Sequence, residues 1–149
     1  MIGPKYEQTQ RPSAAEEQLA YELVTLRDLG VCVKCRRVHP VFGVNRDHRK
    51  NRSQGGLTLA SNLNLLCGSG TDGCHGWVTE HPREAVAEGW AVPGWPLADP
   101  REWPARRWVK VPGRFTLSLV WVLYDDVGGF TQITEKEARK RMHEMGWDG

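Results

Sequence analysis

The sequence predicts an α+β fold built around a structural metal site. Four cysteines are spaced as two pairs, a leucine stripe at helical spacing precedes the first pair, and apolar strand-like runs lie in the last third of the chain. The 149 residues, 40% of them hydrophobic and 26% charged, are enough for about one domain with a single modest core.

The first element expected is a helix from about Ser13 to Leu29, after a flexible tail at residues 1–12. Ser13-Ala-Ala-Glu16 has the capping-box pattern, leucines recur at helical spacing after it, and Gly30 ends the run. We expect this leucine stripe to pack in the core. The stripe consists of Leu19, Leu23 and Leu26.

The cysteines predict a zinc site that follows this helix. Cys32-Val-Lys-Cys35 has the two-residue spacing that lets two thiolates reach one metal. Cys67 and Cys74 are separated by Gly-Ser-Gly-Thr-Asp-Gly, whose glycines allow the chain to fold back toward the same ion. Four thiolates complete a closed, tetrahedral, structural site. Two disulfides are the alternative, which the lack of a secretion signal disfavours.

Between the cysteine pairs, the sequence favours strands and loops. Residues 36–48 contain Val and Phe together with a proline and a glycine, so two short strands are expected there. This arrangement puts Asp47 and His48 at the end of the second strand. Residues 49–56 are expected to form a loop, and residues 57–66 an irregular segment that returns to the metal.

The remaining elements are helical segments, a connector and a small sheet. A helix is expected at the second cysteine pair, with Pro82 interrupting it or opening a second short helix that ends at Gly89. The Trp- and Pro-rich stretch that follows is expected to be an ordered connector. Apolar runs within residues 106–133 predict antiparallel strands, and Thr134 is expected to cap a last helix to about Met145.

Positive charge is concentrated in one segment, although the net charge of the chain is only +2. Seven of the eight charged residues between Val31 and Arg52 are Lys or Arg. Such a segment suits a polyanion, and nucleic acid is the commonest one in a cell. A solvated basic loop is the alternative that this feature alone leaves open.

Several side chains near this segment suit phosphodiester hydrolysis. His48 can act as a general base, because an imidazole titrates near neutral pH. Asp47 faces the opposite side of the strand and can hold a divalent cation or orient the site. His75 follows a zinc ligand and can supply a second cation ligand, with His81 as its rival. Asn62 can hold the loop in place or orient His48 through a backbone hydrogen bond.

Basic residues beside these groups can bind phosphate oxygens of DNA. Each residue alone also has a structural explanation, because an Asp-His pair is most often exposed polar surface and a lone Asn is usually a turn former. It is the combined order and spacing that favour a functional site. The residues expected to contact DNA are Arg46, Arg49, Lys50 and Arg52.

This order and spacing resemble the HNH endonucleases. Their ββα-metal motif contains Cys-x2-Cys, then Asp-His-x-x-Pro-Arg-Ser-x-Gly-Gly, then Asn-Leu-x-x-Leu-Cys, then Cys-His. The stretch after the last motif is similar to HNH proteins encoded by actinobacterial phages and their hosts. The corresponding segments in this chain are residues 32–35, 47–56, 62–67 and 74–75.

The resemblance implies a ββα-metal core with its zinc site in residues 13–92, and a small β-rich extension packed on it in residues 93–149. In that family the His of the Asp-His pair activates water, the Asp and the late His bind one divalent ion, and the Asn is positional. The chain departs from the family pattern in the longer second cysteine spacing and in Asn51, which replaces a proline. The family roles fall here to His48, Asp47, His75 and Asn62.

The sequence therefore predicts a zinc-stabilised HNH endonuclease that cleaves DNA with Mg²⁺ or Mn²⁺ as the catalytic ion. Two alternatives stay open. One is a zinc-knuckle DNA-binding protein without cleavage, and the other is an accessory protein for phage DNA packaging, with packaging proteins as partners. No apolar run is long enough to span a membrane, so we expect a cytoplasmic protein, in a bacterial host if a phage encodes it.

Overall fold

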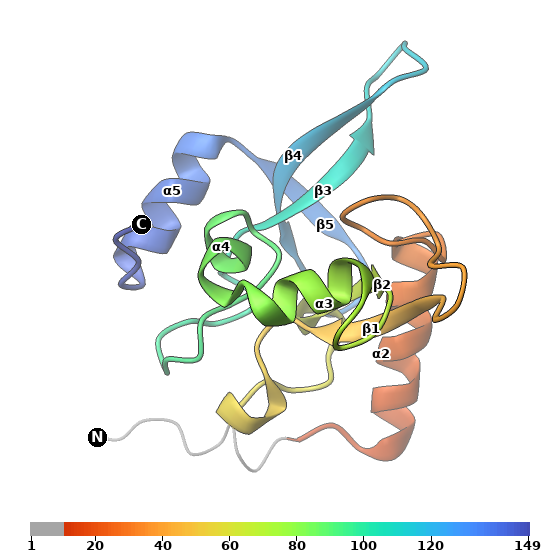
Figure 1. Ribbon diagram of the computed structural model, residues 1–149. Helices are drawn as coiled ribbons and strands as arrows, with labels where there is room; N and C mark the ends of the chain where they lie inside the picture. Colours follow the sequence, from red (N-terminus) through yellow and green to blue (C-terminus); the bar gives the residue numbers. More distant parts are fainter. Residues whose placement is uncertain (1–10) are drawn as a thin grey trace.

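The computed structural model describes residues 11–149, which form an α+β arrangement of helices around two small antiparallel sheets (Figure 1). The tail expected at residues 1–12 lies outside the described residues except for its last two. The elements in chain order are α2 (Ala14–Arg27), β1 (Val44–His48), η1 (Arg52–Gln54), η2 (Ala60–Asn62), β2 (Leu63–Cys67), α3 (Gly73–Glu80), α4 (Pro82–Ala87), β3 (Ala105–Lys110), β4 (Leu117–Tyr124), β5 (Phe130–Ile133) and α5 (Glu135–Glu144).

Helix α2 begins where the sequence predicts but buries a different face. The Ser13 side chain accepts from the Glu16 amide and the Glu16 carboxylate accepts from the Ser13 amide, which completes the capping box. The expectation that the leucine stripe packs in the core is wrong for Leu19 and Leu26, which are exposed. The helix instead packs Ala20 and Val24 against residues of η2 and β2, and Leu23 is partly buried against the same cluster. Its buried residues are Ala20, Val24 and Arg27.

Strand β1 pairs antiparallel with β2, in a register that sets Asp47 opposite Asn64. This pairing corrects two expectations. Residues 36–42 form no regular strand, and the partner comes instead from residues 57–66, which we expected to be irregular. All five residues of β2 are buried. A strand buried on both faces lacks polar alternation, so its sequence carries no period-two signal.

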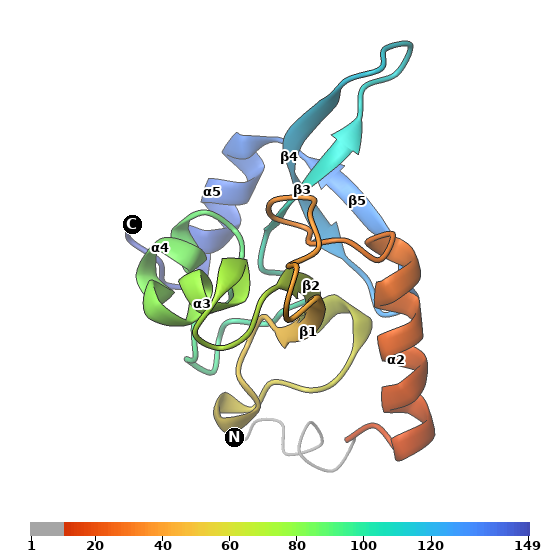
Figure 2. The same ribbon diagram turned by 45° about the vertical axis from the view of Figure 1, so that its right-hand side comes forward.

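The second half of the chain follows the prediction closely. Helices α3 and α4 meet at Pro82, which takes the first position of α4. Strands β3, β4 and β5 form a three-stranded antiparallel sheet in that order. Thr134 caps α5 by accepting a hydrogen bond from the Glu137 amide at 3.0 Å. Figure 2 shows the β3–β4 hairpin projecting beyond the other elements.

Apolar packing crosses the boundary that we expected between residues 92 and 93. One cluster around the cysteines joins β2 to α3 and α4. A second cluster combines α4 and the connector with β4 and α5, so residues on both sides of the boundary share one buried volume. The buried members of this second cluster are Val86, Val92, Ala98, Trp103, Trp121, Ala138 and Met142.

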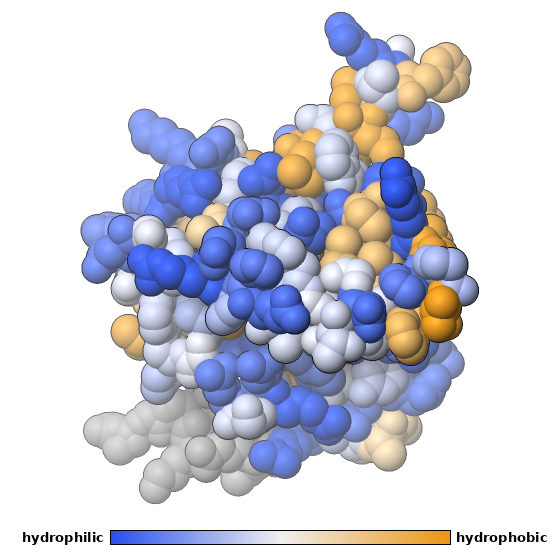
Figure 3. Space-filling model, viewed as in Figure 1, coloured by the Kyte–Doolittle hydropathy of each residue, from blue (hydrophilic) through white to orange (hydrophobic). Residues whose placement is uncertain are grey.

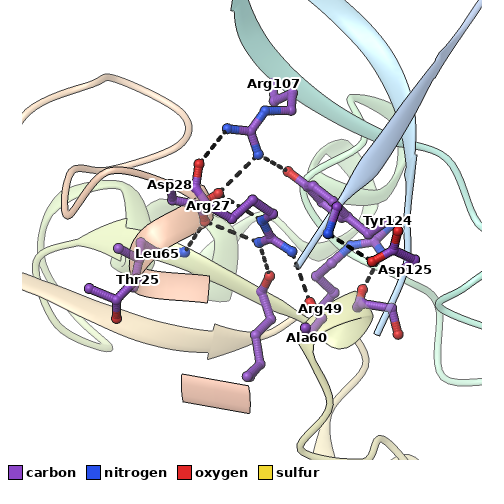
Figure 4. A network of polar contacts seen from close by, with 12 residues as sticks. Thr25, Arg27, Asp28, Arg49, Ala60, Leu65, Arg107, Tyr124 and Asp125 are labelled. Carbon is purple, nitrogen blue, oxygen red and sulfur yellow. Dashed lines mark hydrogen bonds and ion pairs between the residues drawn. The ribbon is translucent and has the colours of Figure 1, made fainter. Parts of the chain in front are cut away.

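A buried polar network also joins the two halves (Figure 4). Asp28, just after α2, accepts hydrogen bonds from Arg27 Nε and from Arg107 Nη1, both at 2.9 Å. Its other oxygen accepts from the Leu65 amide at 3.1 Å. Arg107 comes from β3 and also donates to the Tyr124 hydroxyl. One carboxylate therefore fixes α2, β2 and the three-stranded sheet relative to one another.

Candidate functional site

The four cysteines converge on one point, as their spacing predicts. One sulfur atom from each of Cys32, Cys35, Cys67 and Cys74 lies within 4.8 Å of the other three. The Sγ atoms of Cys35 and Cys67 are 3.6 Å apart. A tetrahedron with zinc–sulfur bonds of roughly 2.3 Å has an edge of about 3.8 Å. The four sulfurs are therefore placed and spaced as a structural zinc site requires.

A closed loop explains how the longer second spacing still brings Cys67 and Cys74 together. Ser69 and Asp72 exchange backbone hydrogen bonds, which closes the insert on itself. Gly68 enters this loop with a φ of +93°, and a Cβ there would lie 2.0 Å from the Asp72 carbonyl oxygen. The Cys74 amide then donates to Cys67 Sγ at 3.4 Å. The insert therefore leaves the metal knuckle intact.

The charge balance of the cluster also favours a cation. The hydrogen bond from the Cys74 side chain lowers the pKa of Cys32 to about 4. The same contact raises the pKa of Cys74, and burial raises the pKa of Cys35. The cluster thus holds one thiolate readily, whereas deprotonation of Cys35 and of Cys74 is disfavoured. A divalent cation supplies the positive charge that the remaining deprotonations need.

Asp47 and His75 meet beside this cluster, on β1 and α3. His75 Nε2 lies 3.2 Å from Asp47 Oδ1, and both side chains are largely buried. The hydrogen bond to Asp47 raises the pKa of His75. Among the described residues, Asp47 Oδ2 and His75 Nδ1 are buried and have no hydrogen-bond partner. A buried carboxylate oxygen without a partner is unfavourable, and a carboxylate beside an imidazole is a donor set that divalent cations accept.

His48 contacts a residue that the sequence analysis missed. Its Nε2 lies 2.9 Å from Thr58 Oγ1, while its Nδ1 makes no hydrogen bond to a described residue. Burial, and then the positive charge of Arg52, lowers the pKa of His48. The imidazole is therefore neutral near pH 7, with one ring nitrogen free to accept a proton. Thr58 is a lone threonine in a loop, so its sequence context gave no sign of this contact.

Asn62 has the first of the two roles that we considered, which is to hold the loop after β1. Its Oδ1 accepts from the Lys50 amide at 2.8 Å, and its Nδ2 donates to the carbonyl oxygens of Lys50 and Leu57. Gly56 lies in the same loop, where a Cβ would come within 1.8 Å of the Lys50 carbonyl oxygen. The loop from His48 to η2 is thus closed by one buried amide side chain.

Two of the residues expected to contact DNA are buried instead, and this corrects the prediction. Arg49 is 2% exposed, and its guanidinium donates to the backbone carbonyls of Ser61, Pro100, Trp103 and Pro104. Burial lowers its pKa to about 10. The Lys50 ammonium is held by the carbonyls of Trp95 and Ala98. Both side chains therefore bind the connector, because its carbonyls converge on the end of β1.

The other two predicted basic residues remain at the surface. Arg46 is exposed beside the Tyr21 ring. The Arg52 side chain is 63% exposed and lies 3.6 Å from Glu17. A cavity of ≈ 600 Å³ opens next to Arg52 and is lined in addition by Thr58 and Asn62, together with residues of the connector. Thr58, the hydrogen-bond partner of His48, therefore lines this cavity, whereas His48 itself does not.

No protein-family model, curated protein or solved structure matches this chain. Across residues 11–149, none of the helices has the length and apolar character that crossing a bilayer requires.

Proposed function

We propose that this chain is a metal-dependent endonuclease of the HNH type that hydrolyses phosphodiester bonds in DNA. The observation that carries the proposal is the 3.2 Å contact between His75 and Asp47, with His48 next to Asp47 on the same strand. The succession of β1, β2 and α3 around a four-cysteine cluster is the one that a ββα-metal motif requires. These features support a catalytic role for Asp47, His48 and His75, none of which indicates such a role by itself in the sequence.

Asp47 and His75 are the residues that would hold the catalytic ion, Mg²⁺ or Mn²⁺. The buried Oδ2 of Asp47, which has no partner among the described residues, supports this assignment. When bound, such an ion polarises the phosphate and stabilises negative charge on the leaving oxygen. Zinc in the four-cysteine cluster is structural in this proposal, because all four positions of a tetrahedron are taken by protein.

His48 is the general base in this proposal. Its bond to Thr58 fixes the ring. With Nε2–H donating to that hydroxyl, Nδ1 carries the lone pair that removes a proton from the attacking water. The lowered pKa keeps this nitrogen unprotonated near neutral pH. General-base help of this kind is typically worth about 10²–10⁴-fold in rate.

Arg46 and Arg52 are the side chains that bind the phosphates on either side of the scissile bond. Both are exposed, and the planar guanidinium suits two-point contact with phosphate oxygens. Arg49 and Lys50 contribute only indirectly, because they hold the end of β1 against the connector. The neighbouring His48 and Asp47 are thereby kept in place.

The proposal is tested with supercoiled plasmid incubated with the purified protein and Mg²⁺, Mn²⁺ or EDTA. We expect nicked or linear plasmid only with metal. His48→Ala should lower the rate by at least about 100-fold while zinc content and the melting temperature stay as in the wild type. His143→Ala is the matched control, since that imidazole lies on α5 and is exposed.

Cleavage by His48→Ala at the wild-type rate would remove His48 as the base. Tight DNA binding without any cutting, at full zinc content, would replace the nuclease with the DNA-binding protein that the sequence also allows. Asp47→Asn adds a separate check, because it should raise the concentration of Mn²⁺ needed for half-maximal cutting. An unchanged metal requirement would contradict the assignment of Asp47 as a ligand.

A further inference from the structure

The β3–β4 hairpin extends beyond its sheet as a two-stranded ribbon. β5 pairs only with residues 121–124 of β4, whereas the pairing of β3 with β4 continues to Lys110 opposite Leu117. The outer part of the hairpin, residues 109–118, therefore has no third strand on either edge in the described structure. It projects from the rest of the molecule in both views (Figures 1 and 2).

The tip of this ribbon is a defined turn. The Arg114 amide donates to the Val111 carbonyl at 3.1 Å, and the Val111 amide donates to the Thr116 carbonyl at 3.0 Å. Pro112 fixes the backbone at the second position of the turn, and Gly113 has a φ of +73°, as a type II turn requires. The turn therefore holds the backbone of the tip in one conformation before any partner binds. Less conformational entropy is then lost on binding.

The exposed side chains at the tip combine an aromatic ring with positive charge. Phe115 has a relative exposure of 105%, and both Lys110 and Arg114 are exposed. The outer part of the hairpin, residues 109–118, contains these two basic residues and no acidic one. Figure 3 shows hydrophilic and hydrophobic surface side by side on the projecting part of the molecule. A partner with negative charge and flat aromatic faces fits this combination, and nucleic acid has both.

The ribbon is tied to the four-cysteine cluster at its base. Trp108 Nε1 donates to the Lys34 carbonyl at 3.0 Å, and Lys34 lies between the first two cysteines. Arg36 and Arg37 follow in the same segment and are exposed. The segment that carries these two exposed arginines is therefore the one that the base of the ribbon contacts.

We propose that this ribbon inserts into the minor groove of duplex DNA and that Phe115 wedges between adjacent base pairs. Two-stranded ribbons are among the elements that read DNA grooves. Apolar wedges next to basic side chains are typical of minor-groove proteins that unstack and bend the duplex. This inference shares with the proposed function only the assumption that DNA is the partner, and it does not depend on cleavage.

The test uses the full chain without added divalent metal, so that no DNA is cut. Closed circular plasmid is relaxed by a topoisomerase in the presence of the protein, and the topoisomers are then separated on a gel. A wedge unwinds the duplex, so the wild type should shift the distribution at every saturating concentration. Phe115→Ala should abolish this shift and weaken binding to a 30-base-pair duplex about tenfold.

Two further variants make the test specific. Val127→Ala removes another exposed apolar side chain, in the β4–β5 turn, and should bind and unwind DNA as the wild type does. Arg114→Ala should reduce the slope of log affinity against log salt by about one. Because these side chains are exposed, the melting temperature should be the same for all three variants.

Saturating wild-type protein that leaves the topoisomers unchanged overturns the proposal, and so does an unaltered shift with Phe115→Ala. The plasmid-cleavage assay tests the nuclease proposal separately from the ribbon proposal. Metal-dependent cutting without unwinding overturns the ribbon proposal alone. Unwinding that depends on Phe115, without cutting under any metal, supports the ribbon and overturns the nuclease.

Discussion

Asp28 lies at the centre of the buried charge in this protein. Its side chain is fully buried, and it accepts from the guanidinium groups of Arg27 and Arg107 and from the Leu65 amide. Removing one partner of a buried ion pair is far more damaging than replacing all of them, because a charge is left without compensation. The stability of the fold therefore depends on this one carboxylate.

We predict that Asp28→Ala lowers the free energy of unfolding by about 3–5 kcal/mol, since two buried guanidinium groups lose their shared anion. Urea unfolding followed by circular dichroism measures the change. Asp148→Ala is the control, because that carboxylate is almost fully exposed, and it should change stability by less than about 0.5 kcal/mol. An Asp28→Ala protein as stable as this control would contradict the role given to the network.

The residues of the candidate site differ in how far the sequence could place them. Asp47 and His75 could be paired in advance, because each is tied to a cysteine pair or strand end with a recognisable pattern. The burial of Arg49 could not, since three of the four carbonyls that hold it lie 51 to 55 residues further along the chain. A run of basic residues gives no sign of which side chains turn inward.

At the scale of elements, local signals identified the helices, β1 and the three-stranded sheet but missed the strand that pairs with β1. The capping residues Ser13 and Thr134 act within one turn of chain, so their patterns were sufficient. Strand β2 is buried on both faces and has no alternation to detect. Residues 36–42 have strand-forming side chains, but Val41 and Phe42 are exposed there and form no sheet.

The metal knuckle is the element with the clearest expected effect on stability. Cys35→Ser, or removal of zinc with a chelator, should unfold the protein or lower its melting temperature by well over about 10 °C, because structural zinc binding is part of the folding free energy. Circular dichroism with measured zinc content tests this, and added zinc should restore the chelated wild type.

The matched control for this variant is Val41→Ser, which introduces the same side chain at an exposed position near the knuckle. It should melt within a few degrees of the wild type. A normal melting curve for Cys35→Ser would mean that the four sulfurs do not share a metal, whatever their spacing.

At the scale of the whole molecule, the two halves predicted from the sequence share one apolar cluster. The apolar cluster around Trp103 draws on α4, the connector, β4 and α5. Arg49 and Lys50 reach from the end of β1 to carbonyls of the connector. All of these contacts are lost if the second half of the chain is removed.

We predict that residues 1–92 alone do not fold, even with zinc present. Without residues 93–149, the end of β1 loses the carbonyls that hold Arg49 and Lys50, and the apolar side chains of Val86 and Val92 lose most of the partners that bury them. A two-dimensional amide NMR spectrum tests this prediction. The amide proton chemical shifts should fall in the narrow range that is typical of an unfolded chain. A chain that lacks only residues 148–149 serves as the control and should keep native dispersion. A well-dispersed spectrum for residues 1–92 would show instead that the first half is autonomous.

The Arg49 guanidinium donates hydrogen bonds to the carbonyls of Pro100 and Trp103, so the end of β1 cannot be fixed until these residues have been synthesised. Translation delivers the strand with Asp47 and His48 long before it delivers the residues that immobilise its end. Loop closure over about 50 residues must precede the final geometry, and such non-local contacts form late. The end of β1, with Asp47 and His48, thus reaches its final position only after most of the chain has left the ribosome, so a prematurely terminated product would carry these residues without their native arrangement.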